Sequence, residues 1–219
     1  ASISNISMKS LKENFQKAHI VIIGSGIIGK FNALELSELG FQVTIIDPTQ
    51  LQNSSNAALG LLMGNMYQKR RGRSWDLRKQ SIELWPQWIT FLQKFNNELN
   101  IEKPLIQLTT NEEKFKKLEK FIYENNDINL RILERDSIFI KNINKAFQTK
   151  NIKGMISYKD GRINAKSLLK TLDKYHRYKK INLLEEEIIK IRKSNNHWIS
   201  TTRNNENIKS DIVILCNSL

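Results

Sequence analysis

The chain is poor in cysteine and has no long apolar segment. It carries one cysteine, Cys216, in 219 residues, which excludes an internal disulfide framework and is typical of a protein kept in a reducing cytosol. No apolar run approaches the roughly 20 residues that span a bilayer. Residues 1–17 contain no hydrophobic core of a secretory signal. We therefore expect a cytoplasmic protein without a membrane span.

Metal-ligating residues are also scarce. The chain has three histidines, and neither His176 nor His197 has a second ligand at a useful spacing, so we predict no metal site. We interpret His19 as a residue at a strand boundary. Cys216 would need a lowered pKa and a neighbouring base to act as a nucleophile, and we interpret it as a small buried strand residue.

Basic residues, by contrast, are in excess. The formal net charge is +13, and the lysines are scattered along the whole chain. One cluster is dense: Lys69, Arg70, Arg71, Arg73, Arg78 and Lys79. Because the cluster lies in no known nucleic-acid module, we interpret it as a solvated face and expect no nucleic-acid partner. The alternative is that it attracts an anionic substrate or a tRNA.

The most informative stretch is HIVIIGSGIIG at residues 19–29. A short apolar strand followed by Gly24-x-Gly26-x-x-Gly29 and an amphipathic run is typical of a dinucleotide bound at a helix N-terminus. The next apolar run, FQVTIID, ends on Asp47. This carboxylate lies at about the 20-residue spacing expected of the group that binds a ribose hydroxyl.

The order of the segments predicts an α/β fold. Residues 20–24 and 41–47 are expected to be buried parallel strands, joined by a crossover helix from Ile27 to Leu39 that ends at Gly40. A second helix is expected at 164–178, capped by Asn164. Three meander strands should follow at 181–193, 197–203 and 206–210, and then a continuous buried parallel strand at 211–216.

The middle of the chain is expected to form helices and short strands. A helix is expected from Ser74 to Leu99, kinked or restarted at Pro86. Its apolar side should hold Leu77, Ile82, Leu84, Trp85, Trp88, Ile89, Leu92 and Phe95, and we interpret Trp75, Trp85 and Trp88 as core residues. Short strands (105–108 and 154–158) then flank a charged helix at 111–125. Tyr175 and Lys179 form a Y-x-x-x-K pair, which we interpret as the exposed face of a helix.

At these segments the chain resembles the D-amino-acid oxidase superfamily of FAD-dependent oxidoreductases, in particular its glycine oxidase and sarcosine oxidase-like branch. Three segments carry the resemblance: residues 21–47, the small-residue loop SSNAALGLL at 54–62, and residues 157–218. It implies a Rossmann-like FAD-binding domain with a parallel sheet and a three-strand antiparallel meander, plus an inserted α+β portion of a substrate domain. The implied division is an N-terminal extension (1–17), the first part of the FAD-binding domain (18–100), the substrate-domain portion (101–157) and the second part of the FAD-binding domain (158–219).

The resemblance also implies which residues bind FAD. The pyrophosphate would lie on Gly24, Ser25, Gly26, Ile28 and Gly29. The adenosine ribose would lie at Asp47, followed by Pro48. The flavin side of the loop would be lined by Ser54, Ser55, Ala58, Leu59, Gly60 and Leu61. Ile188 would offer backbone groups to the adenine, and Cys216 and Asn217 would lie where the last strand passes the cofactor.

Two departures from the family pattern affect what can be expected of this chain. The family usually has a glycine where this chain has Ser218, and family members continue well beyond Leu219. We therefore expect the N-terminal part of such an enzyme, which a C-terminal half or a partner chain would complete. No residue between 1 and 219 is compelled to be a catalytic acid or base, so the catalytic residues are unknown.

Four functions are compatible with the sequence. The first is an FAD-dependent oxidoreductase that oxidises the C–N bond of a small amine or amino acid by hydride transfer to flavin. The second is the flavin domain of a tRNA wobble-uridine modification enzyme. The third is an NAD-dependent dehydrogenase, because the glycine motif alone does not distinguish NAD from FAD. The fourth is an inactive or partner-dependent FAD-binding subunit.

Overall fold

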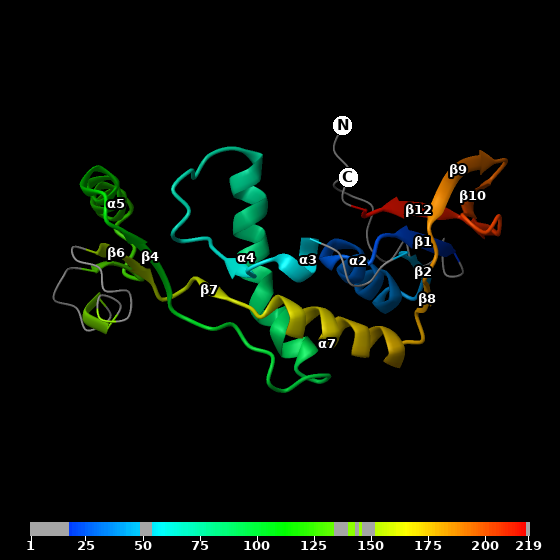
Figure 1. Cartoon of the computed structure of the whole chain (residues 1–219), viewed down its shortest axis with the longest axis horizontal. Helices are drawn as coiled ribbons and strands as arrows, with labels where there is room; N and C mark the ends of the chain where they lie inside the picture. The colour runs from blue at the N-terminus through cyan, green and yellow to red at the C-terminus, as the bar shows by residue number, and fades with distance from the viewer. Residues whose placement is uncertain (1–17, 49–53, 134–139, 143–144, 146–151, 218–219) are drawn as a thin grey trace. The chain divides into compact units, whose positions relative to one another are not determined.

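The computed structural model of the chain describes residues 18–48, 54–133, 140–142, 145 and 152–217 (Figure 1). The predicted N-terminal extension, residues 1–17, and Ser218 lie outside this part. The chain forms two compact units, which are treated separately below. The first comprises Ala1–Ala58, Phe95–Asn97 and Ala165–Leu219, and the second comprises Leu59–Lys94 and Glu98–Asn164. The predicted division into domains stays a prediction.

A four-stranded parallel sheet forms the centre of the first unit. Its strands are β1 (His19–Ile23), β2 (Gln42–Ile46), β8 (Asn182–Leu184) and β12 (Ile212–Leu215), in the order β12-β1-β2-β8. The first two strands are the predicted Ile- and Val-rich runs, and such runs are typical of strands covered on both faces. The predicted α/β fold with a parallel sheet is confirmed.

Helix α2 (Ile27–Glu38) covers one face of this sheet. Its Ala33 is buried in a cluster with Ile20, Ile22, Val43 and Ile45, which alternate along the two central strands. The predicted helix end is correct to one residue. Gly40 follows it with φ +93°, a left-handed conformation that glycine adopts without strain.

Helix α7 (Ala165–Tyr178) packs against α2 through buried polar groups. Here the expected exposed Y-x-x-x-K face is wrong for Tyr175, which is 0% exposed, and holds for Lys179, which is exposed. Its hydroxyl lies 2.7 Å from Ser37 Oγ and donates to Glu38 Oε1 at 2.8 Å, and burial raises the pKa of the phenol. Lys179 pairs with the same Glu38 carboxylate at 2.7 Å. The pair therefore secures helix packing.

Two further ionisable groups lie in the same helix interface. Lys30 is 4% exposed and forms an ion pair with Asp173 of α7. His176 is 7% exposed, and its Nε2–H donates to the Lys30 carbonyl at 3.0 Å. Burial lowers the pKa of this imidazole to about 4. The helix pair therefore holds a neutral histidine beside a buried ion pair.

The meander consists of β9 (Ile188–Ser194), β10 (His197–Thr202) and β11 (Asn207–Ser210), in the order β11-β10-β9. The prediction of one strand over 181–193 is wrong. Residues 182–184 instead join the parallel sheet beside β2, and a new strand begins at Ile188. The three acidic residues 185–187 connect β8 to β9 and belong to neither sheet.

Strand β12 is the last strand of the parallel sheet, but its predicted continuous burial is wrong. Ile212 is 37% exposed and Leu215 is 64% exposed. The strand lies at the edge of the sheet as the structure describes it, so only part of each face is covered.

The second unit contains a three-stranded antiparallel sheet and the helices α4 (Arg73–Leu92) and α5 (Glu112–Asn125). The sheet has the order β4-β6-β5, formed by Leu105–Thr109, Lys153–Ser157 and Leu130–Leu133. Helix α5, the predicted charged helix, packs on it through Leu118 and Phe121. A short pair, β3 (Leu61–Leu62) with β7 (Gly161–Arg162), precedes and follows this block.

Helix α4 runs from Arg73 to Leu92 without a break at Pro86, so the predicted restart is wrong. Its predicted apolar side is only partly buried: Leu77 is 56% and Leu84 is 47% exposed. The three tryptophans Trp75, Trp85 and Trp88 are half-buried rather than core residues.

The turn that follows β3 is held by three charged side chains. Asp160 is 1% exposed and accepts backbone N–H groups of Gly64, Asn65 and Met66 at 2.7–2.9 Å. From the other side, Arg70 donates to the Asn65 carbonyl at 2.6 Å.

Arg78 completes the hold on this turn. It donates to the Met63 carbonyl at 3.0 Å, and its guanidinium lies 4.1 Å from the ring centroid of Tyr67. The interpretation of the basic cluster as a solvated face is therefore wrong for Arg70 and Arg78, which are half-buried. It holds for Lys69, Arg71, Arg73 and Lys79, which are exposed.

Candidate dinucleotide site

The glycine turn begins where β1 ends. Gly24 donates its N–H to the Ile46 carbonyl at 2.8 Å and has φ +109°. A Cβ at Gly24 would lie 2.7 Å from the Cys216 carbonyl group and 2.8 Å from the Asn217 nitrogen. The turn thus requires glycine for its conformation and for its close packing on the chain after β12.

The second and third glycines differ in what they leave open. A Cβ at Gly29 would lie 1.9 Å from the Gly24 carbonyl oxygen, so this position packs the helix onto the turn. At Gly26 the nearest atom to a Cβ would be Ser55 Oγ at 3.1 Å, and φ is −66°, which other residues adopt readily. Gly26 therefore leaves space above the turn rather than relieving strain.

The first turn of α2 offers backbone donors toward this space. Gly26 is the N-cap residue and provides no side-chain cap, and no acidic residue lies in the first turn. Ser55, on the short helix α3 (Ser54–Ala57), accepts the Ile27 N–H at 2.9 Å. The other N–H groups of the first turn have no intrahelical acceptor, and with the helix dipole they favour an anion there.

Asp47 lies directly after β2, beside the glycine turn. It is 9% exposed, and its Oδ2 accepts the Ser25 N–H at 2.5 Å. The Ser25 hydroxyl is buried without a hydrogen-bond partner in the described part of the chain. The carboxylate is thereby fixed at the end of the strand, in the position of a group that binds a ribose hydroxyl.

A cavity of about 550 Å³ opens over these groups. It brings together ten of the predicted residues: Gly24, Gly26, Ile28, Asp47, Pro48, Ser54, Ser55, Ile188, Cys216 and Asn217. Ser25 and Gly29 are buried and do not line it, and neither does Ala58. Leu59, Gly60 and Leu61 belong to the second unit, so their role toward a cofactor stays a prediction.

One polar lining residue was missed from the sequence. Glu186 lies between β8 and β9 and lines the cavity, and both its oxygens accept from Asn204 Nδ2 at 2.9 and 3.0 Å. The sequence held a signal for it: Glu186 is two residues before the predicted Ile188, and in extended chain residues two apart face the same side.

Cys216 lies just after β12 and donates its N–H to the Ile23 carbonyl at 2.7 Å. Partial burial raises the pKa of its thiol, which is the opposite of what a nucleophilic cysteine requires. Its place beside Gly24 gives it a packing role in the wall of the cavity.

The described residues contain no group of three or more His, Cys, Asp or Glu side chains arranged to hold a metal ion. None of the helices in the described ranges is long and apolar enough to cross a membrane.

A parallel sheet, a glycine turn at a helix N-terminus and a carboxylate after the next strand define a dinucleotide-binding α/β protein. The family model described as "FAD dependent oxidoreductase", DAO, matches residues 19–219, and the chain belongs to this family. The predicted resemblance to the D-amino-acid oxidase superfamily is thus confirmed. No curated protein sequence matches the chain significantly.

Several solved structures share the fold. Glycine oxidase from Geobacillus kaustophilus superposes with a TM-score of 0.74 and 21% identity, over 92% of this chain and 55% of that one. Iminodiacetate oxidase from Chelativorans sp. BNC1 superposes with a TM-score of 0.75 and 17% identity, over 90% of this chain and 54% of that one. L-proline dehydrogenase from P. horikoshii superposes with a TM-score of 0.68 and 20% identity, over 92% of this chain and 53% of that one. This chain therefore spans about half the length of each.

Proposed function

We propose that the chain binds FAD in the cavity over the glycine turn, and that it forms part of an oxidoreductase that oxidises the C–N bond of a small amine or amino acid. The family is FAD-dependent, and the similar structures include an oxidase of glycine and a dehydrogenase of L-proline. The single observation that carries the proposal is the cavity itself, with its space above Gly26 and the fixed carboxylate of Asp47.

Each part of the cavity fits one part of the cofactor. The free N–H groups at the start of α2 suit the pyrophosphate, and the absence of a Cβ at Gly26 lets the backbone approach it. Asp47 suits the adenosine ribose. The chain after β12, Cys216 and Asn217, closes the wall beside the turn. When bound, the flavin supplies the hydride acceptor, and the protein supplies binding and orientation.

The completing segment is part of the same proposal. The chain spans about half the length of the similar structures, so we propose that a C-terminal half or a partner chain completes the enzyme. Substrate-binding side chains would then come largely from that segment, with a small amine or amino acid as substrate and the cytoplasm as location.

The experiment is the visible spectrum of the purified chain, with the released cofactor identified by mass. We expect FAD at one equivalent, bound before or after reconstitution. An Asp47→Ala variant should lose FAD, whereas Glu206→Gln, an exposed change in the same unit, should retain it. A chain that binds NAD and no flavin would overturn the cofactor, and a folded chain that binds neither would overturn the site.

A further inference from the structure

A second cavity of the first unit lies at the opposite end of the parallel strands. It has a volume of about 440 Å³ and is lined by the first residues of three strands: His19 of β1, Gln42 of β2 and Asn182 of β8. The dinucleotide cavity instead touches Gly24, Asp47 and other residues that follow these strands. The two cavities are therefore separate, and a ligand in one does not occupy the other.

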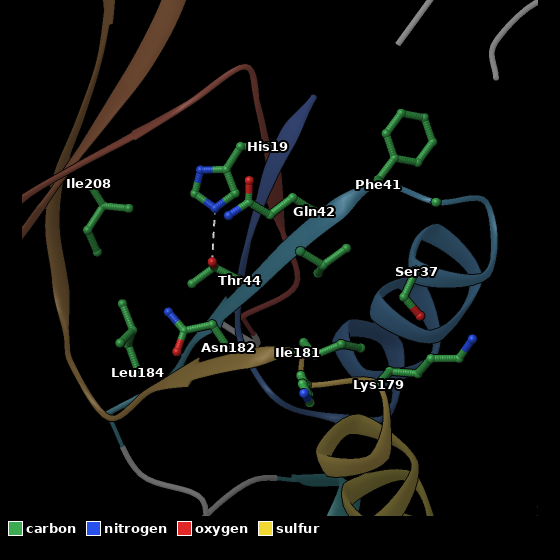
Figure 2. Close-up of a pocket in the computed structure, with 13 residues that line it drawn as sticks. His19, Ser37, Phe41, Gln42, Thr44, Lys179, Ile181, Asn182, Leu184 and Ile208 are labelled. Atoms are coloured by element: carbon green, nitrogen blue, oxygen red, sulfur yellow. Dashed lines mark hydrogen bonds between the residues drawn. The ribbon is translucent and has the colours of Figure 1, made fainter. Parts of the chain in front are cut away.

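His19 lies at the floor of this second cavity and bonds to neighbouring segments; its contact with Thr44 is drawn in Figure 2. The ring Nδ1 lies 2.9 Å from the Lys209 carbonyl of β11, and Nε2 lies 2.9 Å from Thr44 Oγ1 of β2. Because a carbonyl only accepts, Nδ1 donates its proton to Lys209, and Nε2 and the Thr44 hydroxyl share the second hydrogen bond. The backbone N–H of His19 donates to Asp211 at 2.8 Å. Two strands of the sheet and the meander are thus tied together at the cavity floor.

Several polar side chains on the wall have no side-chain partner among the described residues. The amides of Gln42 and Asn182 and the ammonium of Lys180 make no side-chain hydrogen bond or ion pair with any described residue, whereas Lys179 pairs with Glu38. Figure 2 shows Asn182 beside Thr44, below His19 and Gln42. None of the described residues that line the cavity carries a carboxylate side chain.

Apolar side chains complete the wall on both sides of these groups. Phe41 and Ile181 come from the segments that follow α2 and α7, and Leu184 and Ile208 come from β8 and β11. A concave site with an apolar wall and a few convergent polar groups is the usual form of a small-molecule site. An ammonium with two amides and no carboxylate selects a negatively charged oxygen-rich group.

We propose that this cavity binds a small organic anion, with its carboxylate or phosphate held by Lys180, Asn182 and Gln42 and its apolar part against Leu184 and Ile208. The site is independent of the dinucleotide cavity, so the proposal does not rest on the proposed function. A carboxylate and a phosphate ester share the chemistry recognised here, and matched probes distinguish them.

The test is calorimetric titration of the full chain with benzoate, phenyl phosphate and benzyl alcohol, which share an aromatic ring and differ in the head group. At least one anion should bind, and benzyl alcohol should bind at least about tenfold more weakly, because it lacks the charge that strengthens the hydrogen bonds. Preference for benzoate would identify a carboxylate ligand, and preference for phenyl phosphate would identify a phosphate ester.

Variants locate the binding. Lys180→Gln and Asn182→Ala should each weaken the preferred anion by about tenfold, the loss expected for one hydrogen bond to a charged group. Lys166→Gln, on the first turn of α7, the helix that precedes Lys180, is also an exposed change; it removes the same charge away from the cavity and should leave binding unchanged. Prior saturation with FAD should also leave it unchanged.

Three results would overturn the proposal: no binding of either anion to the folded chain, equal binding of benzyl alcohol, or equal weakening by Lys166→Gln. Thermal unfolding of each variant shows whether it is folded. A variant that fails to fold is replaced by Gln42→Ala, which carries the same expectation.

Discussion

At the scale of single residues, the first unit buries groups that usually face water. Lys30 and Asp173 form their ion pair between α2 and α7, and His176 donates to the backbone of Lys30. Removing one partner of a buried ion pair is costly, and a second positive charge beside Lys30, on a protonated His176, is disfavoured. The neutral state of His176 is therefore part of the native packing.

His176 should make stability depend on pH. Its pKa is about 4 in the folded chain against 6.5 for a free imidazole, so the unfolded chain binds the proton first as the pH falls. The contribution is fully present above pH 6.5 and is lost between 6.5 and about 4, with a total of about 3 kcal/mol in the free energy of unfolding. Urea unfolding at a series of pH values measures it. His176→Gln, which keeps an N–H donor without titrating, should flatten this part of the profile; an unchanged profile would contradict the assignment.

Gly26 should affect the cofactor without affecting the fold. Its φ of −66° suits alanine, and a Cβ would come no nearer than 3.1 Å to Ser55 Oγ. Gly26→Ala should therefore unfold like the parent chain but bind FAD at least about tenfold more weakly, because the added methyl group keeps the pyrophosphate from the backbone. Fluorescence titration with FAD measures the affinity. Equal affinity in the variant would place the pyrophosphate elsewhere.

At the scale of elements, the packing of α2 on α7 depends on one phenol. Tyr175→Phe removes the hydroxyl contacts with Ser37 and Glu38 and leaves these groups without that partner. The free energy of unfolding should fall by about 1–2 kcal/mol. Tyr178→Phe is the matched control, because Tyr178 lies one turn later on the same helix and is 71% exposed. Equal effects of the two changes would show that the network contributes nothing.

In the second unit, the turn after β3 should depend on Asp160. Asp160→Asn replaces one acceptor oxygen by an amide that faces the N–H of Gly64, Asn65 or Met66. Loss of a charged acceptor in a buried site should cost about 2–3 kcal/mol. Trp198 is the one tryptophan of the first unit. In a Trp198→Phe background, tryptophan fluorescence during urea unfolding therefore reports on the second unit alone. Asp76→Asn, an exposed change on α4, is the control and should shift the midpoint little.

The elements best predicted from the sequence are those with strong local patterns. The run before Gly24 and the glycine spacing identified β1, the turn and α2, because each position there has a steric reason. Residues 181–193 were harder: one apolar and charged run is divided between two sheets, and strand pairing between distant segments has no local signal. Tyr175 was misplaced for the same reason, since its partners Ser37 and Glu38 lie far away in the sequence.

At the scale of the whole molecule, the net charge of +13 is the most visible property. Two arginines of the dense cluster, Arg70 and Arg78, are engaged with backbone carbonyls. The other four residues of the cluster are exposed, and the rest of the charge is spread over the chain. Exposed charge of this kind gives sequence-independent attraction to polyanions.

Binding to RNA should therefore be unspecific. We expect tRNA and a random RNA of equal length to bind with the same affinity and the same salt dependence. The double change Arg71→Glu and Arg73→Glu should weaken both RNAs no more than Lys116→Glu with Lys117→Glu on α5. Filter binding over a range of salt concentrations measures this. A preference for tRNA that only the first pair of changes abolishes would favour the tRNA-modifying alternative.

The pairing of β12 with β1 has a consequence for the order of events in the cell. Ile20 pairs with Ile212, and Cys216 and Asn217 form the wall of the dinucleotide cavity beside Gly24. A ribosome therefore completes β1, the glycine turn and β2 long before it releases the residues that close the cavity. Until residues 216 and 217 are synthesised, the nascent chain has only part of the proposed cofactor site, so we expect it to acquire FAD only after residue 217 has left the exit tunnel.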